Sequence, residues 1–170
     1  VKRNGEFTVN IALIDGERSV LGVVQVPVSG VIAWAWQGGG AWMARAEAAP
    51  GRCRTRRRAQ PLVVAGSRSH GDPRLLGMLE RVGVHEIIPL GSSLKFLRTA
   101  AAEADLYVRL GPTSEWDTAA AQCVLEEAGG AVIDLHGNPL RYNRKESLLN
   151  PEFIACGDAQ VDLPGLLGGR

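Results

Sequence analysis

The chain has 170 residues, of which 45% are hydrophobic and 22% are charged. These proportions are ordinary for a globular domain with a buried core, and they argue against a disordered chain. The formal net charge of +1 carries little information about partners. No apolar run approaches the roughly 18 residues of a membrane span, and residues 1–6 lack the apolar core of a signal peptide. We therefore expect a cytoplasmic protein without stable membrane insertion, with a peripheral position at the inner membrane as the alternative.

The N-terminal part of the chain alternates apolar and polar residues in the way of an antiparallel sheet. Residues 7–14 and 20–26 are predicted to pair as a hairpin around an Asp-Gly turn, and residues 31–36 form a third strand. A glycine-rich turn at 38–42 leads into a fourth strand. We expect the edge of this sheet to be open, as in a fragment of a larger sheet, and to allow self-association or pairing with another chain.

The composition changes between residues 44 and 60. Five arginines crowd into this segment without an apolar period: Arg52, Arg54, Arg56, Arg57 and Arg58. A basic run can bind nucleic acid or polyphosphate, or it can be an exposed connection. Because no aromatic residues are interleaved for base stacking, we favour the connection and expect no nucleic-acid partner. We place a boundary here, between a remnant of an N-terminal sheet domain at 1–58 and a C-terminal α/β domain at 59–170.

After Pro61 the pattern changes to strands that alternate with helices. The predicted strands are 62–65, 85–89 and 106–109, and the predicted helices are 73–82, 93–104 and 116–128. Further strands are predicted at 131–134 and 153–156, and residues 161–170 are predicted to be a loose end. Short connections between alternating elements are typical of an α/β layer.

A single acidic residue, Asp117, stands where a Gly-Pro loop turns into an alanine-rich helix. Pro112 and the two hydroxyl residues after it favour a turn with helix-capping oxygens. We expect Trp116 to anchor this loop against the core while Asp117 points outward, where its carboxylate can face a metal ion. The alternative is that Asp117 only caps the helix or complements its dipole.

A second element of chemical interest is the Gly-Ser-Ser-Leu-Lys segment that opens the helix predicted at 93–104. A helix start presents unpaired backbone N–H groups and a positive dipole end, both suited to a phosphate. Ser92 and Ser93 add hydroxyl donors, and Lys95 adds a positive charge. Arg109, which ends a strand, can reach the same cleft. The alternatives are an ordinary helix N-cap and a solvated strand end.

A third candidate is the histidine of a Ser-Arg-Ser-His segment, His70, which follows a buried strand. Open α/β sheets commonly bind ligands at the carboxyl ends of their strands. His70 can donate a hydrogen bond or carry a positive charge beside a phosphate, and the alternative is an incidental loop histidine.

The three cysteines, Cys53, Cys123 and Cys156, are isolated and lack metal-ligand spacing. An odd number of scattered cysteines predicts reduced thiols rather than a disulfide framework. We expect Cys123 to face the core from its helix and Cys156 to lie in a buried strand.

Four segments, in this order and spacing, carry a resemblance to a known family. They are residues 3–13, 66–70 (Gly-Ser-Arg-Ser-His), 91–96 (Gly-Ser-Ser-Leu-Lys-Phe), and 110–121 continuing into 142–151. By these segments the chain resembles the magnesium-dependent, lithium-sensitive phosphatases of the inositol monophosphatase superfamily, and most closely the CysQ-type 3'(2'),5'-bisphosphate nucleotidases. The resemblance implies an α/β fold, the layered αβαβα sandwich shared with fructose-1,6-bisphosphatase. This chain would hold the C-terminal domain plus the last strands of the N-terminal sheet.

The resemblance also implies a function. Such enzymes hydrolyse the 3'-phosphate of 3'-phosphoadenosine 5'-phosphate to give AMP and phosphate during sulfate assimilation, with Mg²⁺ as cofactor and lithium as inhibitor. The residues that would bind this phosphorylated nucleotide are His70, Ser92, Lys95, Arg109 and Asp117, and Asp117 would also be a metal ligand. The alternatives are an inositol-phosphate phosphatase and a non-catalytic module that binds phosphorylated nucleotides or completes its sheet with another chain.

One departure from the family bears on activity. The family has a helical glutamate and an Asp-Pro-Leu-Asp-Gly-Thr loop, both metal-binding, upstream of the segment that corresponds to residues 1–6. We find no second acidic residue placed comparably to Asp117, because Glu115 should point elsewhere on the helix start and Glu126 lies more than two turns along it. We therefore expect an N-terminally truncated chain that is inactive if these 170 residues are the entire polypeptide.

Overall fold

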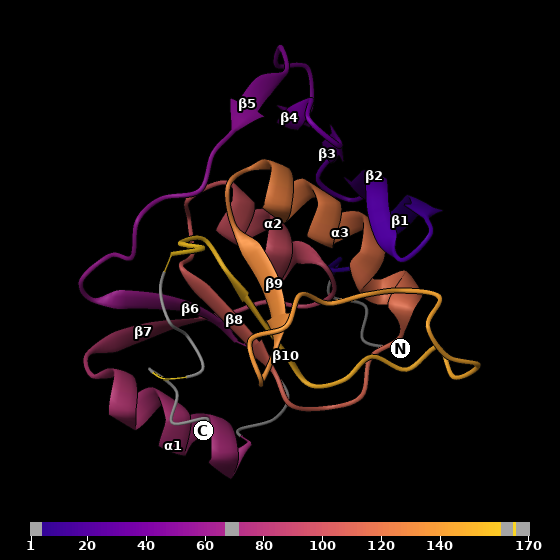
Figure 1. Cartoon of the computed structure of the whole chain (residues 1–170). Helices are drawn as coiled ribbons and strands as arrows, with labels where there is room; N and C mark the ends of the chain where they lie inside the picture. Colours follow the sequence, from indigo (N-terminus) through magenta and orange to yellow (C-terminus); the bar gives the residue numbers. More distant parts are fainter. Residues whose placement is uncertain (1–4, 67–71, 161–164, 166–170) are drawn as a thin grey trace.

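The computed structural model describes residues 5–66, 72–160 and 165 of the chain. Within these residues, two five-stranded sheets enclose a layer of two helices, and a third helix covers the far side of the second sheet (Figure 1). The strands of the first sheet are β1 (Val9–Asp15), β2 (Arg18–Val26), β3 (Val31–Trp36), β4 (Gly40–Arg45) and β5 (Gly51–Cys53). Those of the second sheet are β6 (Leu62–Gly66), β7 (His85–Pro89), β8 (Leu106–Arg109), β9 (Ala131–Asp134) and β10 (Phe153–Cys156). The helices are α1 (Pro73–Val82), α2 (Leu94–Ala100) and α3 (Glu115–Glu127). The predicted layered α/β sandwich is confirmed.

The first sheet is an antiparallel meander in the order β1-β2-β3-β4-β5, which confirms the predicted hairpin and the two strands after it. Alternation along the strands turns one face toward the helices, where Val24 and Ala33 are fully buried. The opposite face carries apolar side chains that are exposed, including Ile11 at 61% and Trp36 at 46%. In the described part of the chain, nothing packs over this second face.

The second sheet is mixed, in the order β7-β6-β8-β10-β9. Strand β6 runs parallel to β7 and β8, and β10 runs antiparallel to both of its neighbours. Because β6 and β8 are parallel, their carboxyl ends at Gly66 and Arg109 reach the same edge of the sheet. This edge is where the candidate site lies.

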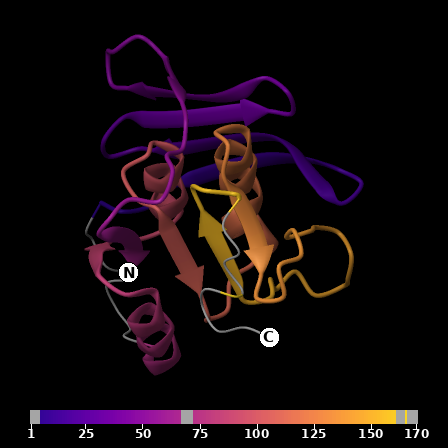
Figure 2. The same cartoon turned by 60° about the vertical axis from the view of Figure 1, so that its left-hand side comes forward.

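Helices α2 and α3 form the middle layer, between the two sheets, in both Figure 1 and Figure 2. An aromatic cluster joins α2 to the second sheet: the ring of Phe96 lies 5.3 Å from that of Tyr107 and 5.8 Å from that of Phe153, between centroids. Helix α1 covers the other side of the second sheet through Leu79, which is fully buried. The three cysteines are buried and free, as predicted.

Two features differ from the predicted elements. The helix predicted to run to residue 104 ends at Ala100, because Ala102 takes a left-handed φ of +60° and the chain turns into β8. The arginine-rich segment contributes a short strand, β5, in which the guanidinium carbon of Arg52 lies 4.8 Å from the ring centroid of Trp42.

The predicted division into two domains, between residues 58 and 59, stays a prediction. None of the helices in the described residues has the length and apolar character needed to span a bilayer.

The connection between the two sheets is held by one buried carboxylate, Asp105. Its Oδ1 accepts a hydrogen bond from Arg56 Nε at 2.8 Å, and its Oδ2 accepts one from Arg56 Nη2 at 3.1 Å. The backbone N–H groups of Ala59 and Val63 donate to the same carboxylate. The Asp105 side chain is only 3% exposed, whereas that of Arg56 is 35% exposed. One carboxylate therefore ties the arginine-rich connection to the start of β6.

Replacing Asp105 by asparagine should destabilise the protein by about 2–3 kcal/mol. The change removes the negative charge that pairs with Arg56 and that accepts hydrogen bonds from two backbone N–H groups. Glu103→Gln is the matched control. Glu103 pairs with Arg45 and Arg98 on the surface, where such pairs contribute about 1 kcal/mol or less. Urea unfolding followed by circular dichroism measures both. Equal losses in the two variants would contradict this role for Asp105.

The middle layer packs very closely against the first sheet at Gly22 of β2. A Cβ built on Gly22 would lie 2.2 Å from the backbone oxygen of Ala120 in α3. No other residue type fits there without separating the helix from the sheet. Glycine on the strand and alanine on the helix therefore set the spacing of these two layers.

The substitution Gly22→Ala should lower stability by about 1–3 kcal/mol through overpacking, which lowers the melting temperature by roughly 2–4 °C per kcal/mol in a chain of this size. Gly77→Ala serves as the control, because Gly77 lies within α1 and a Cβ there meets nothing within 4 Å. That change should raise stability by about 0.5–1 kcal/mol through helix propensity. Thermal unfolding compares the two, and an unchanged melting temperature for Gly22→Ala would refute the close contact.

Candidate functional site

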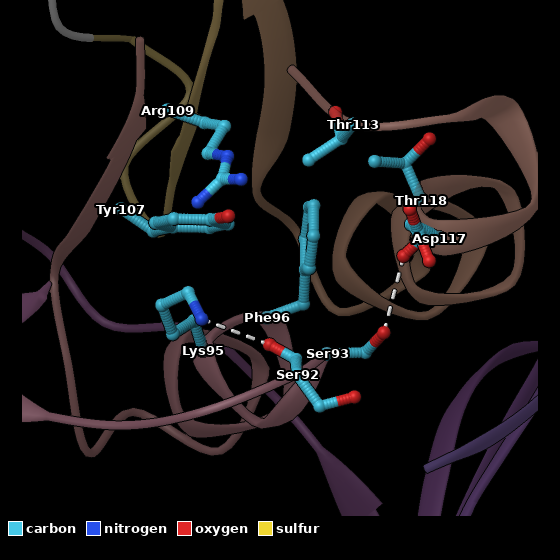
Figure 3. Close-up of a pocket in the computed structure, with 9 residues that line it drawn as sticks. All are labelled: Ser92, Ser93, Lys95, Phe96, Tyr107, Arg109, Thr113, Asp117 and Thr118. Carbon is cyan, nitrogen blue, oxygen red and sulfur yellow. Dashed lines mark hydrogen bonds between the residues drawn. The ribbon is translucent and has the colours of Figure 1, made fainter. Parts of the chain in front are cut away.

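A cavity of about 210 Å³ opens where α2 begins, β8 ends and α3 begins (Figure 3). Its lining residues are Ser92, Ser93, Lys95, Phe96, Tyr107, Arg109, Thr113, Asp117 and Thr118. Four of the five predicted site residues are thus brought together: Ser92, Lys95, Arg109 and Asp117. The fifth, His70, lies outside the described residues.

Lys95 supplies a buried positive group at the floor of the cavity. The residue is 5% exposed, and its Nζ donates hydrogen bonds to the carbonyl oxygens of Ser92 at 3.0 Å and Leu90 at 3.2 Å. The same Nζ lies 5.0 Å from the ring centroid of Tyr107. Burial disfavours the charged ammonium, and with the nearby positive charge of Arg109 it lowers the pKa of Lys95 to about 8. An anion in the cavity would favour the charged form.

The two serines play different parts. Ser92 takes a left-handed φ of +47°, which directs its carbonyl to Lys95, and its Oγ lies 2.6 Å from the Oγ1 of Thr8. The Ser93 hydroxyl donates to the backbone carbonyl of Asp117 at 3.1 Å. It therefore joins α2 to α3 rather than serving as the free ligand donor that the sequence suggested for it.

Arg109 extends from the end of β8 over the cavity (Figure 3). Its Nε donates to the carbonyl oxygen of Gly111 at 3.1 Å, and its Nη2 donates to that of Pro112 at 2.9 Å. The Gly-Pro loop thereby fixes the plane of the guanidinium. The remaining N–H groups stay available to an anion, because a guanidinium carries five donors.

Asp117 lies in the first turn of α3 with its side chain exposed. Its Oδ2 accepts the backbone N–H of Ser114 at 3.1 Å, which forms a capping box. The capping alternative and the outward orientation are therefore both observed. Glu115 points away, as predicted, and accepts hydrogen bonds from Lys145 Nζ at 3.1 Å and from the N–H of Asn143 at 3.2 Å.

Asn150 holds the loop that carries Asp117. Its Nδ2 donates to Thr113 Oγ1, to the carbonyl oxygen of Ser114 and to Thr118 Oγ1, at 2.8–3.2 Å. Asn150 belongs to the segment 142–151, which carries part of the resemblance to the family. Its hydrogen bonds to the loop, which we call the Asn150 clamp, give a physical reason why this segment belongs to the pattern. The loop depends on a residue that follows it by more than thirty positions, so local sequence rules do not detect the contact.

The expectation for Trp116 was wrong. Its side chain is 62% exposed and does not anchor the loop against the core. Glu115 and Thr118 occupy the inward positions of the first turn of α3, with 7% and 1% exposure, so the helical period turns Trp116 outward. Sequence reasoning also missed Tyr107, which lies two residues before Arg109 on the same strand. Alternation along a strand places both on the same face, and that signal was present.

The comparisons with known proteins decide the family. Residues 1–161 match the model of the inositol monophosphatase family. The chain belongs to the inositol monophosphatase family. The crystal structure of CysQ from Bacteroides thetaiotaomicron, described as a bacterial member of this family, is similar with a TM-score of 0.83 and 37% identity, covering 95% of this chain and 65% of that one. An inositol monophosphatase from Zymomonas mobilis, at 22% identity and a TM-score of 0.73, shares the fold.

Among curated relatives in the family, the chain is similar to proteins named 3'(2'),5'-bisphosphate nucleotidase CysQ. The one from Shigella flexneri is 48% identical over 153 residues, which make up 90% of this chain and 61% of that protein. The one from Haemophilus influenzae is 33% identical over 164 residues, covering 95% of this chain and 61% of the relative. The chain thus spans about three fifths of the length of the curated relatives that it matches.

Asp117 is the residue predicted to bind a metal ion, and that part stays a prediction. The Asp117 carboxylate is exposed at the cavity and has one oxygen, Oδ1, without a hydrogen bond in the described structure, so it fits a single Mg²⁺ ligand. Across residues 5–66, 72–160 and 165, no three His, Cys, Asp or Glu side chains come together in a way that could hold a metal. A magnesium site assembled from these residues alone would be incomplete.

The lowered pKa of Lys95 predicts pH-dependent anion binding. Below about pH 8 the ammonium is charged and attracts an anion, and above it the charge is lost, so the affinity for sulfate should fall at least about fivefold between about pH 7 and about pH 9.5. Sulfate stays a dianion over this range, so the ligand itself does not titrate.

The test is calorimetric titration of sulfate into the wild type, Lys95→Met and Lys145→Met. Lys95→Met should bind weakly with no pH dependence in this range. Lys145 pairs with Glu115 and does not line the cavity. Lys145→Met should therefore bind sulfate with the same affinity and pH dependence as the wild type. A wild-type affinity that stays constant across this range would rule out the assigned part of Lys95.

Proposed function

We propose that this chain carries the nucleotide-binding part of a magnesium-dependent phosphomonoesterase whose substrate is 3'-phosphoadenosine 5'-phosphate. In the reaction a water oxygen attacks the 3'-phosphorus, the bond from phosphorus to the ribose oxygen breaks, and the ribose oxygen takes a proton. The products are AMP and phosphate. The observation that supports this most is the convergence of Lys95, Arg109 and Ser92 with Asp117 on one cavity, in a chain similar to CysQ nucleotidases.

The chemistry of the cavity suits a phosphate. Two positive groups and several hydroxyl-bearing side chains line a space large enough for a phosphoryl group and part of a sugar, and charge-assisted hydrogen bonds to a phosphate are strong. Lys95 and Arg109 would balance the phosphate charge, Ser92 would donate a hydrogen bond, and Asp117 would contact both the substrate and Mg²⁺. The parts assigned to His70 and to lithium inhibition rest on the family resemblance, and the expected cytoplasmic location rests on the sequence.

The nearest alternative within the family is an inositol-phosphate phosphatase. Both substrates present a phosphomonoester to the same cationic cavity, so the cavity does not separate them. The similarity to proteins named as bisphosphate nucleotidases favours the nucleotide. Phosphate release from 3'-phosphoadenosine 5'-phosphate and from myo-inositol 1-phosphate, measured in parallel, decides between them.

A second candidate function is a non-catalytic module that binds phosphorylated nucleotides and associates with another polypeptide, or with itself, through its first sheet. Two observations favour it. No three His, Cys, Asp or Glu side chains gather into a metal site among the described residues, and apolar side chains such as Ile11 and Trp36 are exposed on the outer face of the first sheet. Exposed apolar surface of this kind commonly marks an interaction site. Such a module would bind the nucleotide without releasing phosphate.

Asp117→Asn is the decisive variant. In a polypeptide that also supplies the further carboxylate ligands, and with Mg²⁺ present, phosphate release should fall by about two orders of magnitude, because a charged group aimed at the reacting centre is removed. Nucleotide affinity without Mg²⁺ should change little, since Lys95 and Arg109 remain. Asp15→Asn, an exposed carboxylate at the end of β1, is the control and should keep wild-type turnover. Nucleotide binding without turnover in that polypeptide, with its Asp117 intact, would instead support the module.

A further inference from the structure

The hydroxyl group of Tyr107 is a polar group that the site described so far does not use. Tyr107 is 5% exposed, and its ring packs edge-on against Phe96 and Phe153, with centroid distances of 5.3 Å and 5.5 Å. The hydroxyl makes no hydrogen bond to any described residue. Figure 3 shows it pointing from β8 into the cavity, below the guanidinium of Arg109 and above Lys95.

The other tyrosine of the chain shows what a structural hydroxyl looks like here. Tyr142 is 1% exposed, and its hydroxyl lies 3.2 Å from Thr118 Oγ1 and 2.5 Å from Gln122 Oε1. A buried tyrosine normally satisfies its hydroxyl in this way, since an unpaired buried polar group is costly. Tyr107 is almost as buried but directs its hydroxyl into open space between two cationic side chains.

We infer that the Tyr107 hydroxyl donates a hydrogen bond to a phosphate oxygen of the ligand, between Lys95 and Arg109, and so positions that phosphate. This inference rests on the proposed function, because it requires the cavity to bind a phosphorylated small molecule. Arg109 is two residues further along the same strand, so a single strand presents both donors to the anion.

The protonation state of Tyr107 agrees with a donor. Burial disfavours the phenolate and raises the pKa of Tyr107 to about 12, against a smaller opposing effect of Arg109. The hydroxyl therefore keeps its proton at neutral pH. Tyr107 and the two cationic side chains present donors to the same space. A phosphate or sulfate ester, with several acceptor oxygens and no donors of its own when fully ionised, matches that set.

The test uses Tyr107→Phe, which removes one oxygen and keeps the ring, its aromatic packing and its contact with Lys95. Calorimetry without Mg²⁺ measures binding of inorganic phosphate and of 3'-phosphoadenosine 5'-phosphate to the 170-residue chain. We expect affinity for both ligands to fall by about ten- to a hundredfold, because one hydrogen bond to an ionised group is lost. The melting temperature without ligand should be unchanged or higher, since no internal partner loses its hydrogen bond.

Tyr142→Phe is the matched control, with the opposite pattern expected. It should lower the melting temperature, because Thr118 and Gln122 lose a partner, and should change phosphate affinity less than twofold. The inference would be overturned if Tyr107→Phe bound inorganic phosphate as tightly as the wild type. It would also be overturned if the wild type bound no phosphate. Weaker phosphate binding by Tyr107→Phe, in a protein that neither binds nor hydrolyses the nucleotide, would uphold the inference while refuting the proposed function.

Discussion

The close approach of α3 to β2 holds the middle layer in place, and the candidate site depends on it. At Gly22 the strand has no side chain toward the helix, and the backbone of Ala120 occupies the space that a Cβ would need. The alanine-rich side of α3 lets the helix lie flat on the sheet, so its first turn reaches the edge where β8 ends. The contact therefore fixes the position of α3, and of Asp117 in its first turn, relative to the first sheet.

Contacts between elements that lie far apart in the chain then refine the site. The Ser93 hydroxyl joins the start of α2 to the first turn of α3 through the carbonyl of Asp117, and Asn150 fixes the loop before that turn. Two cationic groups, Lys95 and Arg109, face the same small space, and burial, followed by the charge of Arg109, lowers the pKa of Lys95. The same arrangement that costs stability in the free protein favours a phosphate when one binds.

Much of this architecture was predictable from local pattern. Alternation identified the strands of the first sheet, and the switch to alternating strands and helices identified the second. The family pattern singled out Ser92, Lys95, Arg109 and Asp117, and all four line one cavity. Trp116 was assigned the wrong side of its helix, because the inward face of a first turn is chosen by what packs there, and here Glu115 and Thr118 take it.

The sequence by itself determined the types of element, the family and four side chains of the candidate site, because periodicity and motif order are written along the chain. Only the tertiary structure decided which groups meet: the Asp105 carboxylate that ties the arginine-rich connection to the second sheet, the Asn150 clamp, and the Tyr107 hydroxyl left open to the cavity. The Asp105 and Asn150 contacts join residues that are distant in sequence, and their hydrogen bonds depend on how the layers pack, which no local pattern encodes.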